Sequence, residues 1–165
     1  MTKSSTPYPE RLRHSTTNRT VVYELNNDAY ALHYSEAHAV VEGSQQVLND
    51  GTVAVFIGSC GARAERDKTT TLGPVYVMQP GGAVAVPTGL ILLRFSNNVR
   101  AQSRAPELEK LGYDITEVLS YAPNCAWVRD AAGDISRGLG GISKLETLRN
   151  LENVEPQMLM HSPRR

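Results

Sequence analysis

Cysteine, aromatic residues and excess charge are all scarce in this chain of 165 residues. Its 2 cysteines are too few for a disulfide scaffold, and neither has a second cysteine or a histidine at metal-site spacing. The 17 basic and 17 acidic residues cancel, so the chain has no broad cationic surface of the kind that binds nucleic-acid backbones. We therefore expect no metal, no cofactor and no nucleic acid among its ligands.

Long apolar runs are also missing. The longest, Val53–Ile57 and Leu90–Leu93, have the length of strands, whereas a membrane-spanning helix needs roughly 20 apolar residues. The first residues, Met1 to Pro7, contain no apolar core of a secretory signal. We expect a cytoplasmic protein that does not enter a membrane.

The first part of the chain contains two segments that differ in their pattern of polar and apolar residues. Residues 1–19 are polar and show neither the strand nor the helix period, which predicts a flexible polar arm. In residues 20–87, short apolar runs alternate with turn residues, a pattern typical of a small antiparallel β module. The expected strands are Val21–Leu25, Tyr30–His33, Ala37–Val41, Val53–Ile57, Val75–Met78 and Val84–Val86.

The apolar pattern changes again in residues 88–160. A continuous apolar run at Leu90–Phe95 predicts a buried strand. Apolar residues then recur at helical spacing between 105 and 111, and Gly112 is a suitable helix end. Two strands, a second helix and a last strand are expected, in order, at Ile115–Tyr121, Ala126–Arg129, Ile135–Leu151 and Val154–Leu159.

This order of elements is β-α-β-β-α-β, the ferredoxin-like arrangement. The predicted fold class is therefore α+β, with a small antiparallel β module at 20–87 followed by a ferredoxin-like domain at 88–160. Residues 161–165 are left as a C-terminal tail.

Five short motifs in the second domain occur in a specific order. They are Leu92-Leu93-Arg94-Phe95, Leu111-Gly112-Tyr113, Tyr121-Ala122-Pro123-Asn124, Ala126-Trp127-Val128 and the stretch from Leu148 to Pro156. In this order and spacing, residues 88–160 resemble the N-terminal prodomain of bacterial subtilisin-like serine proteases. Residues 20–87 resemble the β-rich segment found upstream of it in some of these proteases.

The resemblance implies a role. Such a prodomain inhibits a catalytic domain and assists its folding. This sequence ends at Arg165 without a catalytic domain. The resemblance therefore implies a non-enzymatic, free-standing module that acts in trans on a separately encoded subtilisin-like protease. Its sheet would face the enzyme, and its C-terminal tail would enter the substrate cleft by strand addition. The residues expected to bind this partner are Tyr121, Trp127, Glu155, Met158, Leu159, Met160, His161, Arg164 and Arg165.

Two other interpretations stay open. One is a non-catalytic adaptor or regulatory module of ferredoxin-like fold that binds a partner other than a protease. The weaker one is a small enzyme that uses Cys60 or the pair His33 and His38. Neither Gly58-Ser59-Cys60-Gly61 nor the glycine-rich stretch from Gly138 to Lys144 has the spacing of a nucleophile elbow or a phosphate loop.

Overall fold

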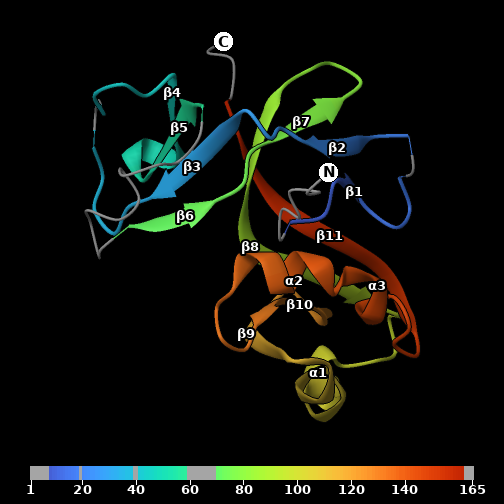
Figure 1. Cartoon of the computed structure of the whole chain (residues 1–165). Helices are drawn as coiled ribbons and strands as arrows, with labels where there is room; N and C mark the ends of the chain where they lie inside the picture. The colour runs from blue at the N-terminus through green and yellow to red at the C-terminus, as the bar shows by residue number, and fades with distance from the viewer. Residues whose placement is uncertain (1–7, 19, 39–40, 59–69, 162–165) are drawn as a thin grey trace, which may run out of the picture. The chain divides into compact units, whose positions relative to one another are not determined.

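The computed structural model describes residues 8–18, 20–38, 41–58 and 70–161. The chain forms two compact units: unit 1 comprises Met1–Val22 and Thr88–Gln157, and unit 2 comprises Tyr23–Pro87 and Met158–Arg165. Two long strands, β8 (Val84–Phe95) and β11 (Leu151–Met160), belong in part to each unit (Figure 1). The structure is a mixed α and β fold of mostly antiparallel strands with few helices. Within the described ranges, no helix has the length and apolarity needed to cross a membrane.

Four strands of a seven-stranded sheet carry the core of unit 1. β9 (Tyr113–Leu119) pairs with β10 (Ala122–Asp130), β10 pairs with β8, and β11 pairs with β8. The β9–β10 and β10–β8 pairs are both antiparallel. The order across this part of the sheet is therefore β9-β10-β8-β11.

The helices of unit 1 are short. They are α1 (Ala105–Leu111), which follows the 3-10 turn η3 (Ala101–Arg104), and α2 (Ile135–Gly140) and α3 (Ile142–Leu145). Proline stands in the first turn of α1, and Gly112 ends it with a φ of 90°. Glycine suits this position because L side chains are strained in the left-handed region. The predicted helix at 105–111 and its end at Gly112 are confirmed.

One face of this sheet carries the core. Alternate residues of β8 and β10 point to it, as the pleat of a strand requires, and α1 and α3 cover it with Leu108 and Leu145. Its buried members are Ile91, Leu93, Phe95, Ala101, Leu108, Tyr113, Ala126, Val128, Leu145 and Val154. The two helices therefore share one side of the sheet.

The expected long second helix was wrong. The helix is interrupted between α2 and α3 and ends at Leu145, and β11 begins at Leu151. A Cβ at Gly141 would collide with the hydroxyl of Tyr113, so the chain at this point lies against a residue distant in sequence. Leu148 and Leu151 still pack against the same core, but from a turn and a strand, which is why their spacing resembled a helix.

The prediction of a flexible polar arm was also wrong for the described residues 8–18. Arg11–Arg13 form β1, in which Leu12 is buried. Farther along, the hydroxyl of Thr16 accepts a hydrogen bond from the Val154 amide (3.1 Å), and the Thr16 amide donates to Asn153 Oδ1 (3.0 Å). Polar side chains here satisfy the backbone of β11, a use that composition alone does not reveal. The rest of the expected arm, residues 1–7 and 19, lies outside the described residues.

Unit 2 contains a second sheet of four strands in the order β4-β5-β3-β6, with antiparallel neighbours. Its strands are β3 (Ala29–His33), β4 (Gln46–Leu48), β5 (Val53–Ile57) and β6 (Thr71–Gly73). Apolar side chains line both of its faces, with Ala31, Val53 and Val55 in one cluster and Leu32, Ala54 and Phe56 in the other. The remaining strands are β2 (Val22–Leu25) and β7 (Tyr76–Gln79), the latter forming a hairpin with the start of β8.

The expected strands of this region have mixed outcomes. Those near 22–25, 30–33, 53–57 and 75–78 are confirmed, whereas β4 and β6, of 3 residues each, were not predicted. The strand expected at Ala37–Val41 was wrong, since residues 37, 38 and 41 are not in a strand and 39 and 40 lie outside the described residues. The two strands expected on either side of Pro87-Thr88-Gly89 form the single strand β8.

Candidate protein-binding face

The face of the unit 1 sheet opposite the core is the candidate site. Residues of β8 and β10 that alternate with the core residues point away from α1 and α3. We call this surface the outer face; its members on these two strands are Leu90, Leu92, Arg94, Cys125, Trp127 and Arg129. None of them belongs to the core cluster under α1 and α3, and of the six only Cys125 is buried.

The outer face has an apolar centre. Leu92 lies directly opposite Trp127 in the register of β8 and β10, and both side chains are half-buried. Arg94 stands two residues along β8, opposite Cys125, with its Nη1 atom 3.9 Å from Glu152 Oε2. Arg129 lies opposite Asp114. An apolar centre within a charged rim is the usual composition of a protein–protein interface.

A bulge in β9 shapes the surroundings of Trp127. Trp127 lies opposite Glu117 while Val128 lies opposite Ile115, so Thr116 is the extra residue. Its hydroxyl donates a hydrogen bond to the carbonyl of Trp127 at 3.2 Å. Bulges of this kind redirect neighbouring side chains. The bulge places the carboxylate-bearing Glu117 beside the ring-bearing Trp127.

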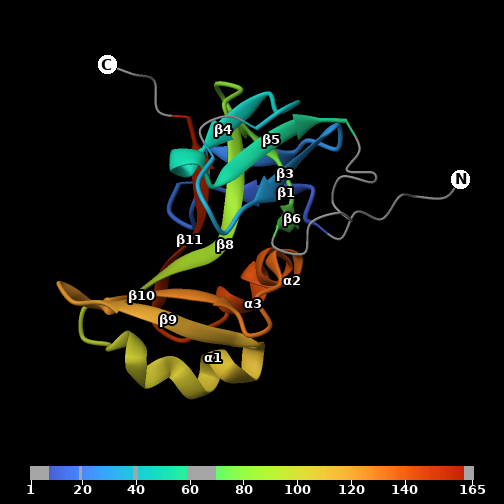
Figure 2. The ribbon, with the colours of Figure 1, turned by 90° about the vertical axis from the view of Figure 1, so that its left-hand side faces the viewer.

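Tyr121 occupies the turn between β9 and β10. Its side chain is 83% exposed, the largest exposed fraction among the exposed large apolar residues described. Figure 2 shows the β9–β10 hairpin lying over α1, with its turn extending past the start of the helix. An exposed ring at a hairpin tip contacts a partner at little cost in side-chain entropy.

The C-terminal residues expected at the site are divided between the two units. Glu155, in unit 1, has its Oε1 atom 3.8 Å from His14 Nε2. Met158 and Leu159 belong to unit 2, where both are half-buried in β11 and Leu159 packs against the cluster of Ala31 and Val55. Met160 and His161 are exposed. Arg164 and Arg165 lie outside the described residues.

The structure describes two of the three residues of the catalytic interpretation, His33 and His38. Cys60 lies outside the described residues. His33 is half-buried, its Nε2 atom has no hydrogen-bond partner, and burial lowers its pKa. His38 is exposed, and its ring makes an edge-on contact with Tyr34, with ring centroids 4.8 Å apart. In the part of the chain that the structure describes, no three His, Cys, Asp or Glu side chains are grouped so that they could hold a metal.

Cys125 is the one cysteine within the described residues. Burial raises the pKa of its thiol, and the nearby Arg94 guanidinium offsets this only in part. The thiol is therefore held in its protonated form, which is a poor nucleophile. Cys125 serves the outer face as a small buried side chain.

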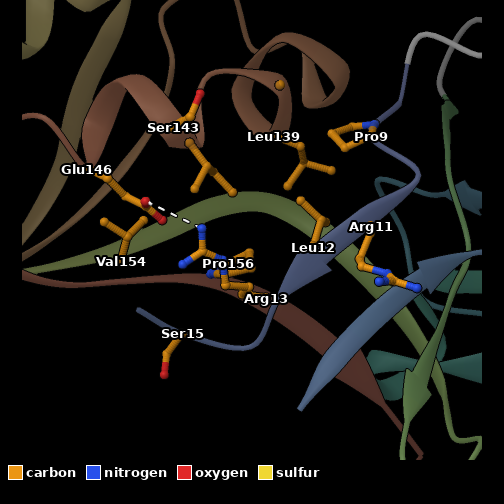
Figure 3. Close-up of a pocket in the computed structure, with 12 residues that line it drawn as sticks. Pro9, Arg11, Leu12, Arg13, Ser15, Leu139, Ser143, Glu146, Val154 and Pro156 are labelled. Carbon is orange, nitrogen blue, oxygen red and sulfur yellow. Dashed lines mark ion pairs between the residues drawn. The ribbon is translucent and has the colours of Figure 1, made fainter. Parts of the chain in front are cut away.

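Unit 1 also holds a cavity of about 350 Å³ between the β1 segment, the two short helices and β11 (Figure 3). Its floor is apolar, with Leu12 and Leu139 among its members. At its rim Arg13 Nη2 lies 3.9 Å from Glu146 Oε2. The full lining is Pro9, Arg11, Leu12, Arg13, Ser15, Leu139, Gly140, Ile142, Ser143, Glu146, Val154 and Pro156. Its charged side chains are Arg11, Arg13 and Glu146, and Glu146 is the partner of Arg13 in this ion pair.

A buried polar pair holds the end of β10 against α2. The carboxylate of Asp130 accepts hydrogen bonds from the amides of Ala132 (3.0 Å) and Asp134 (3.1 Å). The hydroxyl of Tyr113 donates to the carbonyl of Gly138 at 2.5 Å. Burial, with the nearby Asp130 charge as a second cause, raises the pKa of Tyr113 to about 12. These groups are satisfied locally, so they support the sheet.

The sequence identified only part of the outer face. Trp127 and Tyr121 were named, and both lie in the β9–β10 hairpin region of unit 1. Leu92 and Arg94 were missed as binding residues because the apolar run of β8 does not distinguish its two faces. The pairing of Leu92 with Trp127 is a long-range feature with no local signal.

Comparison of the chain with family models, with curated proteins and with solved structures found no match. The geometry of the outer face and the motifs that form it are therefore the basis on which a function is proposed.

Proposed function

We propose that unit 1 is a ferredoxin-like module that binds a subtilisin-like serine protease through its outer face, as an inhibitor, a folding chaperone or both. The observation that carries the proposal is the half-buried pair of Leu92 and Trp127 at the centre of that face. The fold assignment is supported by the strand order β9-β10-β8-β11, with α1 between β8 and β9 and with α2 and α3 between β10 and β11.

The energetics favour a protein ligand. A tryptophan at the centre of an interface is commonly one of the few residues whose truncation costs about 2 kcal/mol or more. Leu92 supplies an apolar neighbour directly across the sheet, and the charged groups of Arg94 and Arg129 stand at the border.

The choice of a protease follows from where the motifs lie. Three of the stretches that resemble a subtilase prodomain form parts of this region. Leu92–Phe95 lies in β8, Tyr121–Asn124 lies at the β9–β10 turn, and Ala126–Val128 in β10 contains Trp127. Leu159 is packed in unit 2, so we propose that the part of the chain that enters the substrate cleft begins at Met160. Arg164 and Arg165 would then present basic side chains to the enzyme.

The test uses a subtilisin-like catalytic domain produced without its own prodomain. The full chain is added to the active enzyme, and hydrolysis of a peptide substrate is followed; in a second assay it is added while the denatured enzyme refolds. The proposal expects saturable inhibition in the first assay, a higher yield of active enzyme in the second, or both.

Binding without either effect would contradict the proposal. It would instead favour the adaptor interpretation, in which the same face recruits a partner that is not a protease.

A further inference from the structure

The sheet of unit 1 ends at β9. Among the described residues, β10 is the only strand that pairs with β9. An edge strand presents a row of backbone N–H and C=O groups that can pair with another chain. β9 spans Tyr113–Leu119, which is long enough for an extended peptide to align along it.

A cavity of about 540 Å³ lies along this edge. Four consecutive residues of β9, from Tyr113 to Thr116, line it together with Gln102, Ala105, Glu109 and Arg129. Successive side chains of a strand point to opposite faces, so a cavity bordered by four in a row runs beside the backbone itself. The edge is thus open where a further strand would be added.

The charge of the edge is acidic. Glu109 and Asp114 line the cavity, and Glu117 follows on β9, which itself contains no basic residue. In the described part of the chain, none of these three carboxylates has an ion-pair partner within 4.0 Å. Arg129 is the only basic residue in the lining. Carboxylates without partners beside an open strand edge favour a basic ligand.

We propose that the β9 edge binds an extended, basic segment of a partner protein by strand addition. The segment pairs its backbone with β9 and directs Lys or Arg side chains to Glu109 and Asp114. A second copy of this chain fits less well, because edge-to-edge pairing of two β9 strands places Asp114 and Glu117 near like charges. This binding site adjoins the outer face and shares Arg129 with it, but it uses the backbone of β9, and the proposal does not depend on the protease.

The test is a titration of the full, isotope-labelled chain with an acetylated heptapeptide of valine and lysine, followed by backbone amide NMR. Two of its lysines are adjacent, so that one lies on each face of the added strand. Shifts are expected to concentrate in β9 and at Gln102 and Glu109. Two control peptides separate the causes of binding: one replaces lysine by glutamate, and the other keeps lysine but carries N-methyl groups on alternate amides. Both controls are expected to bind far more weakly, the first through charge and the second through lost backbone pairing.

The matched variant is the double substitution Glu109→Gln and Asp114→Asn, which keeps the shape of both side chains. It is expected to weaken binding by about fivefold, as for two exposed ion pairs, with the spectrum of the free chain otherwise unchanged. Equal binding of the N-methylated peptide, shifts centred elsewhere, or no binding at millimolar peptide would overturn the proposal. So would concentration-dependent self-association through β9, which would assign the edge to a second copy.

Discussion

Leu92 and Trp127 face each other across β8 and β10 on the side of the sheet that α1 and α3 leave uncovered. Their neighbours in sequence, Leu93 and Val128, are fully buried on the other side. One strand pair therefore supplies both the core of unit 1 and the centre of its outer face. The two roles are separable by substitution.

Leu93→Ala and Leu92→Ala form a matched pair that separates them. Leu93 has no exposed surface, so its truncation is expected to lower the free energy of unfolding by about 2–5 kcal/mol through lost burial and a residual cavity. Leu92→Ala, on the half-buried outer face, is expected to cost less than about 1.5 kcal/mol and to weaken partner binding instead. Urea unfolding measures both; equal losses of stability would contradict the assignment of the faces.

Gly141→Ala tests the close approach that breaks the second helix. The added Cβ meets the hydroxyl of Tyr113, so a loss of about 1–3 kcal/mol in unfolding free energy is expected. Gly140→Ala is the control, because nothing lies within 4 Å of a Cβ at Gly140. Adding Tyr113→Phe to Gly141→Ala should recover part of the loss in thermal or urea unfolding. If Gly140→Ala and Gly141→Ala cost the same, the contact is not the cause.

The stability of unit 2 should depend on pH through His33. Burial lowers the folded-state pKa of His33 below its ordinary value of 6.5, so the unfolded state binds the proton more readily. The unfolding free energy is therefore expected to fall as the pH drops from about 6.5 to the lower folded-state pKa of His33. Above about pH 6.5, protonation of His33 is expected to have no effect on it.

Urea unfolding at a series of pH values between 7.5 and 5 measures this dependence. The variant His33→Gln is expected to show a shallower decline over the same range. An unchanged decline in the variant would assign the effect to other groups.

The anchoring of residues 8–18 gives a further test. Thr16→Val removes the hydroxyl that accepts from the Val154 amide, so a loss of about 1 kcal/mol in stability is expected. Limited proteolysis should then cleave the segment near β1 faster than in the wild type. The control is Thr147→Val, whose hydroxyl donates to the carbonyl of Lys144 within its own turn. Unchanged cleavage near β1 in Thr16→Val would argue against the anchoring.

Local signals explain what the sequence could predict. The helix at 105–111 combines apolar spacing, a proline in its first turn and Gly112 at its end, all within one stretch of chain. The hairpin of β9 and β10 was likewise expected from two apolar runs and a turn. Its first strand ends at Leu119, before the predicted end at Tyr121, and its second strand begins at Ala122, earlier than predicted.

Long-range contacts explain what it could not predict. Gly141 lies against Tyr113, which is far away in sequence, and Thr16 binds the backbone of Val154, at a still greater separation. The three-residue strands β4 and β6 are too short to show a period and depend on their neighbours in the sheet. The outer face could not be predicted for the same reason, because Leu92 becomes part of it only through the pairing of β8 with β10.

The inhibition constant of Trp127 variants against a subtilisin-like catalytic domain tests the central claim most directly. Trp127→Ala is expected to raise this constant by about 30-fold, as for the loss of an interface tryptophan worth about 2 kcal/mol. Trp127→Phe should recover part of it, and Leu72→Ala, an exposed apolar residue of unit 2, should leave it unchanged. Inhibition by the wild type that Trp127→Ala leaves intact, or no inhibition and no refolding assistance by the wild type, would contradict the account.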